Sequence, residues 1–132
     1  MTKQTEWRTW NLIGLKVTQL RFDYGFHVDM WSLQRGLRIT FGTQLTLRLT
    51  TGEEQLFDPE QVESLCPLLS LLHCPVAEFA ASIEGKCALR FEDGTELRSE
   101  PHESYEAWES QGSDDLEDAS LLCGVGGGSP WG

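Results

Sequence analysis

The thiol and imidazole groups are the most reactive side chains of this chain, and a metal site is the first chemistry to consider. Structural zinc sites usually place their ligands in pairs separated by about two to four residues. His73 and Cys74 are adjacent, Cys66 lies eight residues before Cys74, and Cys87 lies farther on. This spacing does not fit a zinc site. We therefore expect no bound metal, and reduced cysteines that act as small apolar residues.

A cysteine nucleophile would need a histidine base within hydrogen-bond reach and an environment that stabilises the thiolate. The chain offers His27, His73 and His102 as bases. Its C-terminal half is strongly acidic, however, and negative neighbours raise the pKa of a thiol. We expect no cysteine catalysis.

One carboxylate stands beside an indole in an arrangement that can support acid catalysis. Residues 104–109, Ser-Tyr-Glu-Ala-Trp-Glu, read as a strand with Glu106 and Trp108 on one face. A carboxylate against an indole can have a raised pKa and act as an acid. The simpler interpretation is an interior Trp108, with Glu106 bonded to a backbone group or an arginine. A small ligand-binding or enzymatic β-rich domain, with a pocket around Glu106 and Trp108, is therefore the alternative function.

Two further segments suggest ligands but lack the required pattern. Residues 114–118, Asp-Asp-Leu-Glu-Asp, lack the spaced acids and the distal glutamate of a calcium loop. The glycines of 124–128 are followed by neither a lysine nor a helix, so they do not form a phosphate loop. We predict an acidic loop over 110–120, a glycine-rich tail over 124–132, and no cofactor.

The strongest signal is the position of the charge. The net charge is −11, and residues 92–118 hold eleven acids against the single base Arg98. Such a surface repels nucleic acid and anionic membranes and attracts a basic protein. We therefore expect a non-catalytic binding protein, an immunity or antitoxin-type partner of a basic protein. Aromatic anchors and steering carboxylates define its expected contact surface. The expected partner-binding residues are Glu100, Glu103, Tyr105, Glu106, Trp108, Glu109, Asp114, Asp115, Glu117 and Asp118.

Alternating apolar and polar residues predict strands over most of residues 12–50. Turns are predicted at Tyr24-Gly25 and at Gln34-Arg35-Gly36. Together these signals indicate a half-buried antiparallel meander with apolar residues inward. The inward residues include Phe26, Val28, Met30, Leu37, Ile39, Phe41, Leu45, Leu47 and Leu49.

A short helical segment is predicted next. Asp58 is a suitable N-cap, and Pro59 suits the first helical position. Pro67 lacks the amide hydrogen that a helix interior needs, so we expect two short turns over 59–65 and 67–73. The residues expected to face the sheet are Leu65, Leu68, Leu69 and Leu72.

Strand patterns resume after Pro75 and continue to a predicted edge strand over 121–125. Asp93-Gly94 is the strongest hairpin signal in the chain. A faint repeat relates residues 15–41 to residues 75–91, each a short strand, a glycine turn and an alternating strand that ends in phenylalanine. We therefore predict one α+β domain over 1–132, with a mainly antiparallel twisted sheet in two β-units joined by the helical segment.

Two motifs resemble those of a bacterial family of uncharacterised domains. Phe91-Glu92-Asp93-Gly94-Thr95-Glu96-Leu97 matches a hairpin of the form F-x-D-G-x-x-L, and Tyr105-Glu106-Ala107-Trp108-Glu109 matches the family's Y-E-A-W-E strand. The glycines before Trp131 match a C-terminal Gly-Gly…Trp element, although Pro130 departs from the expected strand. The resemblance spans roughly residues 12–131 and implies a fold, but no reaction.

The expected location is cytoplasmic. No apolar run approaches the ~20 residues that a membrane-spanning helix needs. The first six residues, Met-Thr-Lys-Gln-Thr-Glu, lack the apolar core of a signal peptide. The oligomeric state is left open by the sequence.

Overall fold

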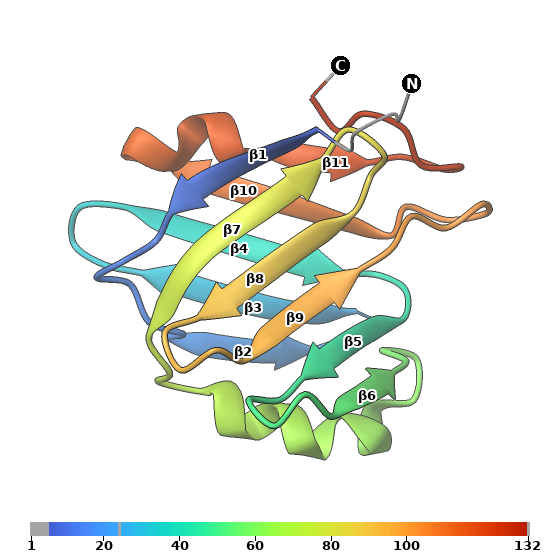
Figure 1. Ribbon diagram of the computed structural model, residues 1–132, viewed down its shortest axis with the longest axis horizontal. Coiled ribbons are helices and arrows are strands. Elements are labelled where there is room, and N and C mark those ends of the chain that lie inside the picture. Colours follow the sequence, from blue (N-terminus) through green and yellow to red (C-terminus); the bar gives the residue numbers. More distant parts are fainter. Residues whose placement is uncertain (1–5, 24, 132) are drawn as a thin grey trace.

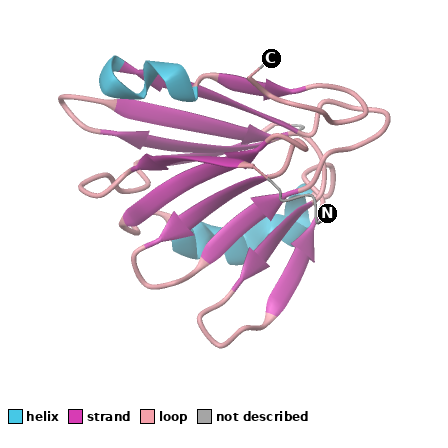
Figure 2. Cartoon of the chain, turned by 45° about the horizontal axis from the view of Figure 1, so that its top comes forward, coloured by secondary structure: helices cyan, strands magenta, loops and turns pink. Residues whose placement is uncertain are grey.

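The computed structural model describes residues 6–23 and 25–131, which form two antiparallel sheets packed face to face (Figures 1 and 2). The six-stranded sheet has the order β1 (Trp7–Asn11), β7 (Val76–Ser82), β8 (Cys87–Phe91), β9 (Glu96–Ser99), β5 (Leu45–Arg48), β6 (Glu54–Phe57). The five-stranded sheet has the order β11 (Leu121–Cys123), β10 (Trp108–Ser113), β4 (Gly36–Phe41), β3 (Phe26–Trp31), β2 (Gln19–Phe22). Two 3-10 helices complete the fold: η1 (Val62–Leu71) and η2 (Asp114–Ala119).

The core lies between the two sheets because each strand turns its apolar residues toward the other layer. In the β3–β4 hairpin, Phe26 pairs with Phe41 and Val28 pairs with Ile39, and all four side chains are fully buried. Phe79 of β7 reaches across the layers and meets the ring of Trp108 edge-on, with 6.0 Å between ring centroids. Burial of these apolar side chains, aliphatic and aromatic, stabilises the packing of the two sheets.

The predicted antiparallel sheet is confirmed, while the α+β label fits only loosely because the helical segments are short. The helical segment η1 separates two runs of strands, β1–β6 and β7–β11, as predicted, but these runs do not form separate sheets. β5 does not continue the meander of β2, β3 and β4; it crosses to the other sheet and pairs with β6 and β9. Alternation specifies which face of a strand is buried, but it does not specify the strand's neighbour.

The helical segment differs from the prediction in its geometry. η1 is one 3-10 helix that runs through Pro67, and it closes the sandwich on the side where β6 and β2 are the edge strands (Figure 1). A 3-10 helix has about three residues per turn, so positions three apart share a face. Leu65, Leu68 and Leu71 accordingly are buried, whereas Leu69 and Leu72, which we expected to face the sheet, are exposed. The N-cap is Gln61, with no side-chain bond, and not Asp58.

The predictions for residues 104–120 also need correction. The strand predicted at 104–109 begins only at Trp108 and runs to Ser113, and residues 103–107 are irregular. The predicted acidic loop over 110–120 is the end of β10 followed by η2. The edge strand predicted near 121–125 is confirmed as β11, and the Asp93-Gly94 hairpin joins β8 to β9. Tyr24 of the Tyr24-Gly25 turn lies outside the described residues.

No helix in the described part of the chain has the length and apolar character needed to cross a membrane.

Candidate functional site

The register of β5 brings three loops to one end of the sandwich. Leu45, the first residue of β5, pairs with Phe57 at the end of β6 and with Ser99 at the end of β9. The segments that precede β5, follow β6 and follow β9 therefore emerge together. β10 joins them from the other sheet, because its first residue, Trp108, pairs with the last residue of β4, Phe41.

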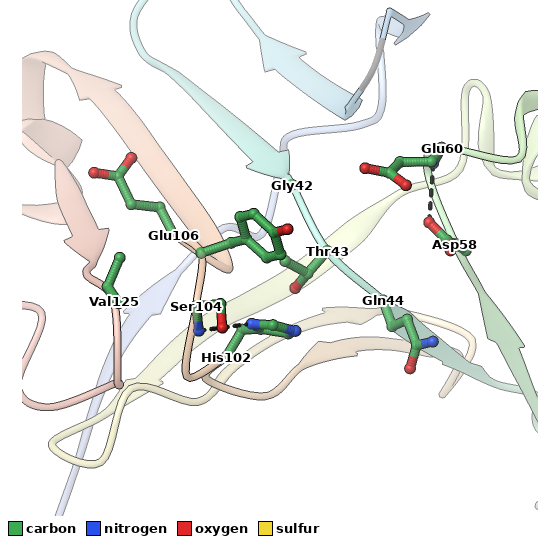
Figure 3. A pocket seen from close by; sticks show the side chains of 10 residues that line it. Gly42, Thr43, Gln44, Asp58, Glu60, His102, Ser104, Glu106 and Val125 are labelled. Atoms are coloured by element: carbon green, nitrogen blue, oxygen red, sulfur yellow. Dashed lines mark hydrogen bonds between the residues drawn. The ribbon is translucent and has the colours of Figure 1, made fainter.

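These loops enclose an open depression of about 680 Å³, here called the acidic pocket. Figure 3 shows Glu106 and Val125 on one side, Asp58 and Glu60 on the other, and Thr43 and Gln44 between them. The volume lies within the range typical of ligand sites. The lining residues are Gly42, Thr43, Gln44, Asp58, Glu60, His102, Ser104, Tyr105, Glu106 and Val125.

Gly42 allows the two halves of the pocket to approach each other. Its amide donates a 2.9 Å hydrogen bond to the carbonyl oxygen of Ala107. A Cβ atom at this position would lie 3.0 Å from the carbonyl oxygen of Glu106. Any larger residue would push the loop that carries Glu106 away from β4.

The loop between β9 and β10 presents a tyrosine ring at the pocket. Nδ1 of His102 accepts a 2.9 Å hydrogen bond from the amide of Ser104, which fixes a tight turn. The His102 ring then contacts the ring of Tyr105, with centroids 5.0 Å apart. Tyr105 stays 63% exposed, which is high for an aromatic residue. The turn thus places an accessible aromatic surface beside the carboxylates.

The carboxylates of the pocket, like those of several other described acids such as Glu92 and Glu117, have no lysine or arginine counter-ion in the described part of the chain. Among the described residues, Asp58, Glu60 and Glu106 make no ion pair with a lysine or arginine, and the pocket lining contains neither of these residue types. Oδ1 of Asp58 accepts a 3.0 Å hydrogen bond from the amide of Glu60, which orients one side of the group. The remaining acceptor positions face solvent in a concave site.

The predicted acidic face is divided by the fold. Tyr105 and Glu106 line the pocket, and Glu103 is exposed in the same loop. Glu100 lies 3.9 Å from the ammonium of Lys86, and Glu109 is half-buried on β10. These five residues lie along the β9–β10 connection and at the start of β10, at the end of that strand opposite η2 (Figure 1).

The acids of η2 lie at the opposite end of β10 and are partly engaged within the chain. Asp118 pairs with Arg8 at 3.3 Å and accepts a 3.0 Å hydrogen bond from the indole of Trp10. Asp115 lies 3.5 Å from Arg35. Asp114 and Glu117 are exposed. The expectation of one continuous face from Glu100 to Asp118 is therefore wrong.

Trp108 cannot be an interface anchor in this fold, because it is only 1% exposed. Its Nε1 donates a 2.8 Å hydrogen bond to the carbonyl oxygen of Gly85, in the turn between β7 and β8. It does not line the acidic pocket either. The reason is that the strand begins at Trp108, so Glu106 lies in the preceding loop and not on the same strand face.

Sequence reasoning missed the half of the pocket formed by Thr43, Gln44, Asp58 and Glu60. Asp58 and Glu60 carried a signal, since they stood in a segment recognised as a turn or helix start. Their proximity to Glu106 depends on the pairing of β5 with both β6 and β9, which no local pattern reveals.

Two of the four cysteines, Cys87 and Cys123, are buried and poorly placed to react. Burial raises the pKa of the Cys87 thiol well above its ordinary value, with the negative charge of Cys123 adding to the effect. Burial also raises the pKa of Cys123. All four cysteines are free, and Cys66 is exposed whereas Cys87 is buried. Within residues 6–23 and 25–131, no three His, Cys, Asp or Glu side chains form a group that could hold a metal ion.

Comparison with known protein families assigns the chain to one of them. The profile of a family of unknown function, DUF6188, matches residues 8–129, which is nearly the whole described chain. The chain belongs to this family. The match includes every strand except the first residue of β1, and it includes all of the acidic pocket. Comparisons with curated proteins and with solved structures found no match.

Proposed function

We propose that this protein is a non-catalytic binding protein that captures a basic protein through its acidic pocket. The observation that carries the proposal is a recess lined by Asp58, Glu60 and Glu106, none of which pairs with a lysine or arginine among the described residues. Carboxylates that are already paired within a chain offer little to a partner. Unpaired carboxylates in a recess attract cationic groups and make stronger bonds as water is displaced.

The pocket has the composition of a binding surface. Tyr105 supplies an exposed aromatic ring, and tyrosine is enriched among residues that dominate interface energies. The net charge of −11 adds long-range attraction that accelerates the encounter with a basic partner. The same charge disfavours nucleic acid and anionic membranes as partners.

We place the protein among bacterial, cytoplasmic partners of the immunity or antitoxin type. A small acidic protein of this type neutralises a basic enzyme by covering its active cleft. The proposal requires the partner to be basic around a cleft or loop that can enter the pocket. It requires no catalysis by the present chain.

The test is capture of partners from the native lysate on immobilised protein, followed by salt elution. We expect a basic protein that remains bound at about 50 mM salt and is released near 200 mM, because screening weakens charge pairing. The captured protein is then identified and purified, and its direct binding is confirmed.

A charge-reversed variant tests whether the capture depends on the acidic pocket. Asp58→Lys combined with Glu106→Lys should lose the captured protein, because two attractive contacts become repulsive. The control is Glu92→Lys combined with Glu117→Lys, which changes the net charge equally at exposed positions outside the pocket. Equal loss in both variants, or an empty column with the unmodified protein, would contradict the proposal.

The alternative of a pocket built around Glu106 and Trp108 has no support from the geometry of Trp108. Glu106 is exposed, and the indole of Trp108 is buried against Gly85 and Phe79. An acid catalyst of the type expected from the sequence needs the carboxylate against the indole, and that contact is absent from the described pocket.

A further inference from the structure

We propose that residues 124–131 form a strap that closes over one end of the core, is latched to β1 by Trp131, and opens as a unit while the sheets stay folded. The strap follows β11 and returns across the β7–β8 turn toward β1 (Figure 1). Its opening does not depend on the proposed binding function. The evidence is the path of the strap, its few bonds, its latch and the thiol that lies beneath it.

The path of the strap depends on its glycines. Gly126, Gly127 and Gly128 have φ angles of +83°, +82° and +95°, a left-handed run that other residues rarely adopt. A Cβ atom on Gly127 would lie 2.8 Å from Cβ of Pro101, so this glycine also allows close packing on the β9–β10 connection. Glycines lose more conformational freedom on ordering than other residues do. The strap must therefore be held in place by contacts with other segments.

Few bonds join the strap to the rest of the chain. Among the described residues, its only backbone hydrogen bond to another segment runs from the amide of Gly126 to the carbonyl oxygen of His102, at 2.9 Å. The amide of Gly127 bonds within the strap, to the carbonyl oxygen of Gly124, at 3.1 Å. Segments with few buried contacts and few backbone bonds open locally at a low cost in free energy. The strap meets this description, in contrast to the paired strands beside it.

The far end of the strap is latched by an arginine that lies between two indoles. The guanidinium carbon of Arg8, on β1, is 5.0 Å from the ring centroid of Trp10 and 5.5 Å from that of Trp131. Asp118 of η2 pairs with the same guanidinium at 3.3 Å and orients it. Trp131 is half-buried and packs against the core. Because a cation is attracted to the face of an indole, Trp131 attaches the far end of the strap to β1.

The thiol of Cys123 lies beneath the strap, where three segments converge at Gly85 of the β7–β8 turn. A Cβ atom on Gly85 would lie 2.9 Å from Sγ of Cys123 and 3.1 Å from the carbonyl oxygen of Gly128. The same atom would lie 3.4 Å from Cα of Gly127. Cys123 is fully buried although β11 is an edge strand, so the strap and this turn contribute to its cover. Opening of the strap should expose Cys123, whereas Cys87, on β8 between β7 and β9, should stay covered.

The strap also forms part of the wall of the acidic pocket. Val125 lines the pocket, and Gly126 bonds to His102, which lines it as well. Release of the latch between Trp131 and Arg8 therefore loosens one wall of the pocket, and closure restores it. The strap is thus a conformational device that connects the latch to the pocket.

Alkylation of the full chain under native conditions measures the opening. Iodoacetamide is added, samples are digested over time, and mass spectrometry gives the extent of reaction at each cysteine. Trp131→Ala removes the indole that contacts Arg8, and we expect Cys123 of this variant to react at least about tenfold faster, because the rate follows the population of the open strap. Cys87 should stay protected, which shows that the sheets remain folded. Trp31→Ala removes an exposed indole elsewhere and should not change the rate at Cys123.

A second pair of variants tests the path of the strap and leaves the latch intact. Gly127→Ala places a methyl group against Pro101 in a backbone conformation that alanine rarely adopts, so it should also accelerate the reaction of Cys123. Gly124→Ala adds the same methyl group where no other atom lies within 4 Å, and it should leave the rate unchanged. Equal rates in these two variants would contradict the proposed path.

The proposal is overturned if Cys123 is as well protected in Trp131→Ala as in the original chain. It is also overturned if Cys87 is accelerated to the same extent, because the protection would then come from the fold as a whole. A reaction of Cys123 in the original chain as rapid as that of the exposed Cys66 would show that the strap shields nothing.

Discussion

The indole nitrogen of Trp108 donates a 2.8 Å hydrogen bond to the carbonyl oxygen of Gly85, which joins the five-stranded sheet to the β7–β8 turn of the six-stranded sheet. Trp108 is also the first residue of β10, immediately after the loop that carries Tyr105 and Glu106. The anchoring of this indole therefore determines where one side of the acidic pocket begins.

Trp108→Phe should destabilise the fold by about 2–4 kcal/mol. The change leaves the carbonyl of Gly85 without its partner and removes part of a buried ring. Urea denaturation measures the effect. Trp31→Phe is the control, because Trp31 is 45% exposed and its replacement should cost less than about 1 kcal/mol. Equal costs for the two variants would show that the bond of Trp108 contributes little.

Asp118 should contribute to stability mainly through the indole of Trp10. Asp118→Asn keeps an acceptor for the Nε1 of Trp10 and removes only the exposed ion pair with Arg8, so we expect a cost below about 1 kcal/mol. Asp118→Ala removes the acceptor as well and should cost about 1 kcal/mol more than Asp118→Asn. Thermal unfolding of both variants checks the order. The account of this contact is wrong if the asparagine variant is as unstable as the alanine variant.

Gly112→Ala should destabilise the fold by at least about 2 kcal/mol. A Cβ atom at this position would lie 1.9 Å from the carbonyl oxygen of Leu116, so the backbone of η2 would have to move. Gly124→Ala is the matched control, since a Cβ atom there meets no other atom within 4 Å. It should change stability by no more than about 0.5 kcal/mol. Denaturation curves for the two variants test the difference.

The cysteines should react in the order of their exposure. We expect iodoacetamide to modify Cys66 first in the native protein, because it is exposed, and to leave Cys87 and Cys123 protected. Mass spectrometry of tryptic peptides over time gives the order. Modification of Cys87 as rapid as that of Cys66 would contradict the buried position of β8.

The raised pKa of Cys87 also predicts a pH dependence of stability. Above the ordinary thiol pKa, about 8.5, the unfolded chain loses the proton while the folded chain keeps it. The free energy of unfolding should therefore fall as the pH rises from about 8 to 10. In Cys87→Ala this part of the decline should be absent. Urea titrations across this range measure it, and an identical decline in the variant would remove Cys87 as its cause.

Local patterns predicted the parts of the fold that depend on neighbouring residues. The alternation in β3 and β4 indicated the buried faces correctly, and Asp93-Gly94 indicated the β8–β9 hairpin. The helical pattern correctly predicted that Leu65 and Leu68 are buried, but it missed Leu71, because apolar spacing alone did not distinguish a 3-10 helix from an α-helix.

The candidate site was predicted only in part, for a physical reason. Tyr105 and Glu106 stand in a motif that sequence analysis can single out. Asp58 and Glu60 reach them only because β5 leaves the meander and pairs with two strands from other parts of the chain. Pairing between distant strands depends on the packing of the whole core. The net charge of a segment does not show which of its carboxylates form ion pairs with arginines in the folded chain.

We propose that the unpaired carboxylates of the acidic pocket bind a basic protein. Isothermal titration of the purified captured partner tests it most directly, with the unmodified chain, Asp58→Asn/Glu106→Gln, and Glu92→Gln/Glu117→Gln. We expect the pocket variant to bind at least about tenfold more weakly and the control variant to stay within about threefold of the unmodified chain. Equal affinity of the unmodified chain and the pocket variant would contradict the claim.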